Sequence, residues 1–244
     1  NLNNISLTNF CIDNDKIYYS SDKYKVYDRQ KNVIFESEND ISLLFKKDTY
    51  LFIGTFGFVY IFDDNILVDY IEIDNEWPIS YYINKNNVII GTNTGNIVKY
   101  SLKDNTAKKH KISNNPIIKI LNTYYVTFNG EIFENNRLIV KLNENTFDAI
   151  LLENNLILAT NKGLIIINPE TENLSEIEFE YPVVSLQSDK FIYASLSNGD
   201  ILIFDKYFNE YGKFAETEAK IVAVDLSKNG NYVATGGADK KLKL

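Results

Sequence analysis

The stretch Ile90-Gly91-Thr92-Asn93-Thr94-Gly95 decides the fold of this 244-residue chain, because versions of it return at regular intervals. It joins an apolar run, a small residue followed by Thr, and a polar turn that contains Gly, and a second apolar run comes after it. That order is typical of two antiparallel strands joined by a tight turn. The seven copies are anchored on Ser20, Thr55, Thr92, Thr127, Thr160, Ser195 and Thr235.

The spacing of these anchors predicts the architecture. Their intervals are 35, 37, 35, 33, 35 and 40 residues, and the apolar runs alternate as strands do. Each unit divides into four strands, which in the second unit are expected at residues 41–46, 50–54, 58–62 and 66–73. The sequence therefore predicts an all-β fold, a seven-bladed β-propeller of four-stranded antiparallel blades, as a single domain over residues 1–244.

Two further patterns fit this architecture. Charged residues such as Lys108, Lys109 and Lys111 gather on the fourth strands, which are expected to be exposed blade edges where charge discourages strand addition. Small residues end the second strands, where neighbouring blades crowd together and a large side chain would not fit. The residues expected at these crowded positions are Gly54, Gly91, Ala159, Ala194 and Ala234.

The seventh unit is incomplete, because it stops at Leu242-Lys243-Leu244 within its third strand. One interpretation is that Leu2-Asn3-Asn4-Ile5 closes the last blade by lying antiparallel to that end. The other is that the natural chain continues past Leu244. Both are left open by the sequence.

The last unit, from Lys220 to Leu244, resembles a WD repeat: it has an apolar strand, the run Ser227-Lys228-Asn229-Gly230, a strand of small residues and a turn containing Asp239. The other units lack the Gly-His and Trp-Asp pairs of that family, although Phe62-Asp63 and Phe204-Asp205 are similar to the closing pair. The resemblance implies a scaffold that binds other proteins. A rival resemblance is to quinoprotein-like propellers, whose repeats contain turns such as Asn168–Asn173.

Composition limits the partners. The net charge of -8 and the pI of about 4.8 argue against nucleic acid and favour basic protein or peptide partners. No run approaches the ~18 apolar residues of a membrane span, so no membrane partner is expected. The single cysteine, Cys11, excludes an intramolecular disulfide and a cysteine zinc cluster, and favours a cytoplasmic location.

Residues that could do chemistry have plainer interpretations. The only histidine, His110, lies among lysines that disfavour a metal ion, and is expected to be an exposed edge residue. Cys11 lies in an apolar strand and is expected to pack there. Asp63 and Asp64 fall in a turn, where Asp is common. We therefore predict no catalytic residue, no metal and no cofactor.

Three aromatic residues are the candidates for a binding site. Trp77 and Tyr181 precede prolines at the start of a blade, and Phe147 is aligned with them. If Trp77, Phe147 and Tyr181 share one repeat position, they ring one face of the propeller and form a binding site. The alternative is that each folds over its own loop as a local cap.

Taken together, these features predict a non-enzymatic scaffold that binds protein or peptide on the face carrying these aromatics, as a monomer or as a subunit of a larger complex. Two alternatives remain. One is a propeller that binds a small ligand or cofactor, quinoprotein-like or lyase-like, in its central channel. The other is an architectural domain of a larger protein.

Overall fold

The computed structural model describes residues 7–13, 16–21, 24–215, 221–226, 233–237 and 242–243. Within these ranges the secondary structure is all strand and turn, with no helix. The residues group into two compact units, of which the first ends at Thr127 and the second begins at Phe128.

The first unit contains three complete sheets and the first half of a fourth. The first sheet holds β1 (Leu7–Asp13), β2 (Lys16–Ser21), β3 (Lys25–Asp28) and β4 (Val33–Glu36). The second holds β5 (Leu43–Lys47), β6 (Tyr50–Thr55), β7 (Phe58–Asp63) and β8 (Ile66–Glu72). The third holds β9 (Pro78–Ile83), β10 (Asn87–Thr92), β11 (Asn96–Ser101) and β12 (Thr106–Lys111). The fourth sheet begins with β13 (Ile117–Leu121) and β14 (Tyr124–Thr127).

The second unit continues the same series. The fourth sheet ends with β15 (Glu131–Glu134) and β16 (Arg137–Lys141). The fifth holds β17 (Thr146–Leu152), β18 (Asn155–Thr160), β19 (Gly163–Asn168) and β20 (Asn173–Glu178). The sixth holds β21 (Val183–Ser188), β22 (Ile192–Leu196), β23 (Asp200–Phe204) and β24 (Glu210–Ala215). The last described sheet has three strands, β25 (Ile221–Leu226), β26 (Val233–Gly237) and β27 (Leu242–Lys243).

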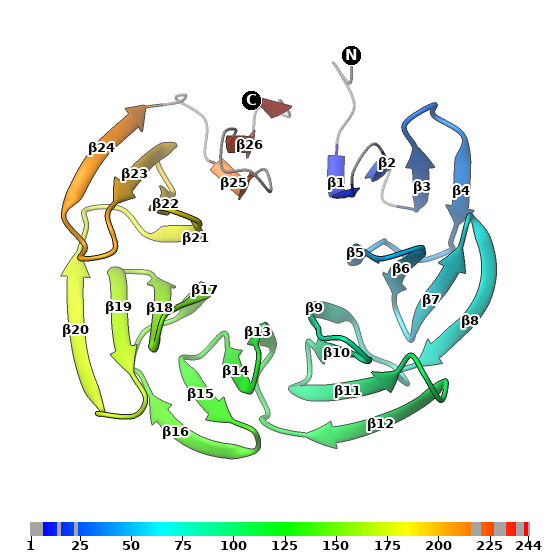
Figure 1. Ribbon diagram of the computed structural model, residues 1–244, viewed down its shortest axis with the longest axis horizontal. Helices are drawn as coiled ribbons and strands as arrows, with labels where there is room; N and C mark the ends of the chain where they lie inside the picture. The colour runs from blue at the N-terminus through cyan, green and yellow to red at the C-terminus, as the bar shows by residue number, and fades with distance from the viewer. Residues whose placement is uncertain are drawn as a thin grey trace. The chain divides into compact units, whose positions relative to one another are not determined.

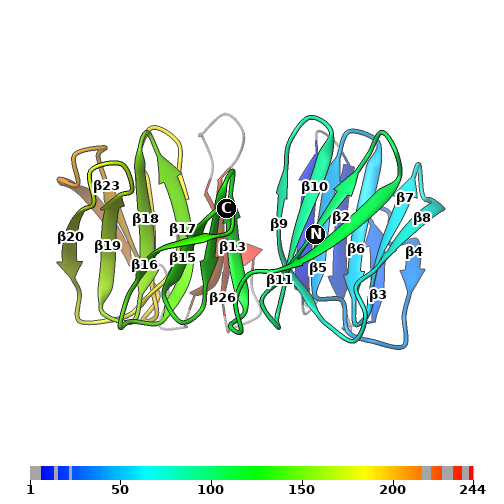
Figure 2. The same cartoon turned by 90° about the horizontal axis from the view of Figure 1, so that it is seen from below.

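Strands pair in chain order within every sheet, as Figures 1 and 2 show for each unit. The prediction of four-stranded antiparallel units is confirmed for six sheets, and the expected strands of the second unit fall within two residues of the observed ones. The two interpretations of the incomplete unit remain predictions, because residues 2–5, Asp239 and Leu244 lie outside the described residues.

The turns follow from residues that tolerate a left-handed backbone. Gly57 and Gly95 have φ of 83° and 87° in the turns after the second strands. Asn65 and Asn105 have φ of 68° and 50° in the turns before the fourth strands. Gly adopts such angles without steric cost and Asn tolerates them, which explains why these residues recur between the strands.

The core lies between successive sheets. In the first unit, Phe45 and Phe52 of the second sheet belong to the same buried cluster as Val88 and Ile90 of the third. In the second unit, Ile157 of the fifth sheet shares a cluster with Leu186 of the sixth. In each unit, these consecutive sheets therefore bury apolar faces against each other, which stabilises their packing.

In the second and third sheets, only a small residue fits near the end of the second strand. A Cβ on Gly54 would lie 2.7 Å from Pro78 Cγ, and a Cβ on Gly91 would lie 2.8 Å from Ile117 Cγ2, each on the first strand of the next sheet. The expected crowding is therefore present at these two residues. In the sixth sheet, Ser195 rather than Ala194 pairs with the first strand at the position that Gly91 occupies in the third sheet. The expected position is therefore one residue off in the sixth sheet. It is two residues off in the last sheet, where Gly236 rather than Ala234 pairs at that position.

Polar side chains also link consecutive sheets, in their first strands or just before them. In the first unit, Asn9 Nδ2 donates to Ile41 O at 2.9 Å, and Ser42 Oγ donates to Pro78 O at 2.8 Å. In the second unit, Asp148 Oδ2 accepts a hydrogen bond from Leu186 N at 2.9 Å. Each bond joins a side chain of one sheet to the main chain of the next, which supplements the apolar contact.

Candidate interaction site around Trp77

The three aromatics of the sequence prediction lie at the starts of sheets. Trp77, in the first unit, is half-buried and directly precedes β9. Phe147 and Tyr181 belong to the second unit: Phe147 is half-buried within β17, and Tyr181 is 40% exposed, two residues before β21.

The strand register shows that these residues do not occupy one repeat position. Trp77 O accepts a hydrogen bond from Asn93 N at 3.0 Å, in the turn that ends its own second strand. The same bond is made by Asn145 O in the fifth sheet and by Pro182 O in the sixth. Phe147 is therefore two residues later than Trp77 in the repeat, and Tyr181 one residue earlier. The alignment behind the predicted ring needs this correction, and the binding role of the three residues stays a prediction.

Two of the three aromatics pack on a ring from the preceding sheet. The Trp77 ring lies 5.3 Å from the Phe56 ring, and Phe56 is in the turn between β6 and β7. In the second unit, Phe147 meets Phe128 edge to face at 6.0 Å. These contacts agree with the alternative that the aromatics cap local turns. A cap of this kind still leaves part of the Trp77 surface exposed to solvent.

Both main-chain polar groups of Trp77 are hydrogen-bonded to Asn93. Trp77 N donates to Asn93 Oδ1 at 2.8 Å, while Asn93 N donates to Trp77 O. One asparagine thus occupies both main-chain groups of Trp77. The position of the indole is set by the turn between β10 and β11 as well as by its own strand.

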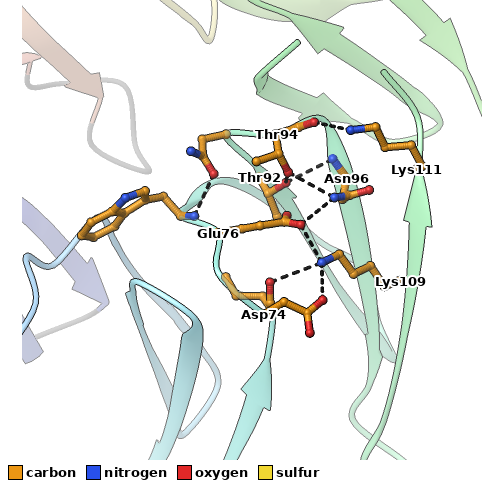
Figure 3. A network of polar contacts seen from close by, with 10 residues as sticks. Asp74, Glu76, Thr92, Thr94, Asn96, Lys109 and Lys111 are labelled. Carbon is orange, nitrogen blue, oxygen red and sulfur yellow. Dashed lines mark hydrogen bonds and ion pairs between the residues drawn. The ribbon is translucent and has the colours of Figure 1, made fainter. Parts of the chain in front are cut away.

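The residue before Trp77 anchors this segment through a partly buried ionic network (Figure 3). Glu76 is only 8% exposed, and its Oε1 accepts from Lys109 Nζ at 2.6 Å and from Asn96 Nδ2 at 2.7 Å. Lys109 also reaches Asp74 Oδ2 at 2.6 Å, so its ammonium lies between two carboxylates. Burying Glu76 would be costly without such partners.

The pKa values reflect these contacts. Burial by itself would raise the pKa of Glu76, but hydrogen bonds from Lys109, Thr92 and Thr94 and the charge of Lys109 outweigh it and lower the pKa. Burial likewise acts to lower the pKa of Lys109, and the hydrogen bonds to Asp74 and Glu76 raise it overall. Both groups are therefore charged near neutral pH, where they form an ion pair.

Sequence reasoning missed this network. It treated Lys109 as one of several solvated edge lysines, and no local pattern connects Lys109 with Glu76, 33 residues earlier. Its expectation for His110 is confirmed, since His110 lies exposed on β12. Cys11 is partly buried and packs against the core between the first two sheets, as expected.

Metal sites and membrane spans are two other features that would indicate a function. Within the described ranges, no group of three or more His, Cys, Asp or Glu side chains is placed to hold a metal ion. The part of the chain that the structure describes contains no long apolar helix that could span a membrane.

No protein-family model matches the sequence, and no curated protein matches it. Solved structures are similar at the level of the fold. A computationally designed protein, Ika8, has a TM-score of 0.80 at 15% identity, covering 98% of this chain and 83% of its own. A chain of the mitotic checkpoint complex has a TM-score of 0.80 at 13% identity, covering 98% and 86%. BamB from Moraxella catarrhalis has a TM-score of 0.72 at 13% identity, covering 97% and 81%. With the repeated antiparallel sheets, these similarities show a β-propeller fold.

Proposed function

We propose that the protein is a non-enzymatic interaction scaffold, a seven-bladed propeller of the WD-repeat type, which binds protein or peptide through the surface around Trp77. The observation that carries this proposal is the fixed and partly exposed Trp77. Its main chain is held by Asn93, and the residue before it is held by a partly buried ion pair.

Such a tryptophan suits binding rather than chemistry. Large aromatics dominate the energy of protein interfaces, and an anchor that is already in place loses little conformational freedom when a partner arrives. The charged groups beside Trp77 hold one another through short contacts. They position the loop, and we assign them no catalytic role.

The interpretation as seven blades is supported by the six four-stranded sheets and the three-stranded sheet that follows them. The net charge of -8 favours partners with basic surfaces. In the second unit, Phe147 and Tyr181 are proposed as partner contacts of that unit, and Tyr181 is the more exposed of the two.

Capture from native lysate tests the proposal, with the full chain, Trp77→Ala and Tyr207→Ala as baits. Tyr207 is a matched control, because it is an aromatic residue that is 73% exposed on a turn of the second unit. Partners identified by mass spectrometry should be lost with Trp77→Ala and retained with Tyr207→Ala. Loss of a hot-spot aromatic costs about 2 kcal/mol or more, roughly a thirtyfold rise in Kd.

A second readout uses the fact that Trp77 is the only tryptophan. A captured partner that covers Trp77 should shift its emission to shorter wavelength and protect it from iodide quenching. If Trp77→Ala melts like the parent chain and keeps every partner, the proposed site is wrong.

A further inference from the structure

One fourth strand differs from the others in its surface. In β8, four large apolar side chains are exposed within five residues: Ile66 at 68%, Leu67 at 50%, Val68 at 53% and Tyr70 at 57%. Its neighbour β12, by contrast, is fully exposed and rich in lysine. The charge expected on fourth strands is present in β8 as Asp69 and Glu72, but it stands beside this exposed apolar surface.

β8 is also an edge. It is the last strand in the order β5-β6-β7-β8, so only one of its two sides is paired in the sheet. The register slips between Ile61 and Phe62 of β7, which leaves Val68 as the extra residue of a bulge. On the far side of the bulge, pairing from Asp69 to Glu72 is regular. An apolar edge of this kind is the surface to which another strand can add.

A polar cavity opens beside the bulge. Its volume is about 140 Å³, and a single water needs only ~10–15 Å³ by the same measure. Its lining includes Val68 and Asp69 of β8, Asp63 of β7 and Tyr100 of β11. Tyr50 and Asn105 complete its polar wall.

The cavity presents oxygen atoms that accept hydrogen bonds. Tyr100 Oη donates to Asp69 Oδ2 at 2.6 Å and lies 3.3 Å from Asn105 Oδ1. Burial and the bond to Asp69 raise the pKa of Tyr100, so the phenol keeps its proton. Asp63 Oδ1 is buried with no hydrogen-bond partner among the described residues. The residues lining the cavity include no Lys, Arg or His, so no cation of the wall offsets the two carboxylates.

An unpartnered buried carboxylate oxygen is costly, and a cationic donor placed there would remove that cost. The tyrosine rings of Tyr50 and Tyr100 also favour a cation over an apolar group. A lysine or arginine side chain carries such a cation on an apolar stem, which suits a cavity whose lining includes Val68 of β8.

We propose that β8 is a second interaction surface, where an extended segment of a partner protein adds as a strand and places a lysine or arginine between Asp63 and Asp69. The apolar residues Ile66, Leu67 and Tyr70 contact the alternate side chains of that segment. The surface is separate from Trp77 and does not depend on the role proposed for it. Charge complementarity selects the occupant, because the cavity is anionic and the whole chain carries a net charge of -8.

The test uses the full chain and fluorescent seven-residue peptides of alternating Val and Thr, in a set that places one lysine at each position in turn. Each peptide is compared with its norleucine counterpart by fluorescence anisotropy. At the best position, lysine should bind at least about tenfold more tightly than norleucine. Asp63→Asn should remove that preference, and N-methylation of alternate peptide bonds should abolish binding because strand addition needs main-chain hydrogen bonds.

The matched variants are Leu67→Lys on β8 and Leu174→Lys on β20, because Leu174 is 47% exposed on another fourth strand. Leu67→Lys should abolish peptide binding, and Leu174→Lys should leave it unchanged. Equal binding of lysine and norleucine peptides would overturn the proposed occupant. Binding that survives both Leu67→Lys and N-methylation would overturn strand addition, as would self-association through β8, detected by sedimentation and removed by Leu67→Lys.

Discussion

Ser80 Oγ donates a hydrogen bond to the main-chain oxygen of Ile117 at 2.5 Å, joining the first strand of the third sheet to the first strand of the fourth within the first unit. Ser80 is 5% exposed and Ile117 is fully buried. The bond therefore satisfies an acceptor that water does not reach.

Removing this hydroxyl should destabilise the protein. Ser80→Ala leaves the buried Ile117 oxygen without its side-chain donor, at a cost of about 1–3 kcal/mol. Urea unfolding followed by circular dichroism measures the change. Ser101→Ala is the control, because Ser101 bonds to Asp104 at an exposed turn, and its loss should cost less. Equal midpoints for Ser80→Ala and the parent chain would contradict the importance of the inter-sheet bond.

Substituting glycine by alanine should destabilise the protein at a crowded position but not at an open one. A Cβ on Gly91 would collide with Ser80 Oγ and lie 2.8 Å from Ile117 Cγ2, so Gly91→Ala should cost about 1–3 kcal/mol through overpacking. A Cβ on Gly212 would meet no atom within 4 Å, and this residue does not need a left-handed backbone. Gly212→Ala should therefore be neutral or slightly stabilising. Thermal unfolding of both variants checks this, and a neutral Gly91→Ala would show that the neighbouring strand can move away.

Because of the ion pair at Glu76, we expect the protein to become less stable in acid. Its pKa in the folded protein lies below the ordinary value of 4.5, so the unfolded chain binds the proton more tightly. The stabilisation is present above pH 4.5 and is lost as the pH falls through the folded pKa. Melting temperatures of the parent chain and Glu76→Gln should therefore differ most near neutral pH and converge in acid. A difference that stays constant from neutral pH into acid would contradict the assignment.

The Phe56 contact should be visible in the fluorescence of Trp77, the only tryptophan. Phe56→Ala exposes one face of the indole to water, so its emission should move to longer wavelength. Phe191→Ala is the control, because Phe191 packs on Tyr211 in the second unit. An unchanged spectrum in Phe56→Ala would mean that the two rings do not shield each other in solution.

Local features of the fold could be predicted from the sequence. The strands follow from the alternation of apolar and polar residues. The turns follow from residues such as Gly57 and Asn65, which readily adopt the left-handed backbone angles found there. The register could not be predicted to the residue. The sixth sheet was anchored on Ser195, but Leu196 ends its paired segment, as Thr92 does in the third sheet. A strand that ends one residue later continues the same alternation, so the period of the repeat does not fix its last residue.

The candidate site was less predictable for a related reason. Trp77 could be selected from the sequence as an unusual residue next to a proline. The groups that fix it could not, because Asn93 and Lys109 are distant from it in the sequence. The turn between β10 and β11 and the pairing of β11 with β12 bring together Asn93, Glu76 and Lys109. Likewise, Asp63 and Asp64 were explained by turn propensity. Only the structure shows that Asp63 Oδ1 is buried and has no hydrogen-bond partner among the described residues.

The side-chain links between consecutive sheets have a consequence for how such a chain can diverge. Asn9, Ser42 and Ser80 donate to the main-chain oxygens of residues 41, 78 and 117, and every amino acid supplies that oxygen. A substitution at an acceptor position keeps the link so long as the backbone path is kept. After duplication of a unit, each copy could therefore drift in sequence without a compensating change in its neighbour. A chain built this way can keep its period long after its copies have ceased to look alike.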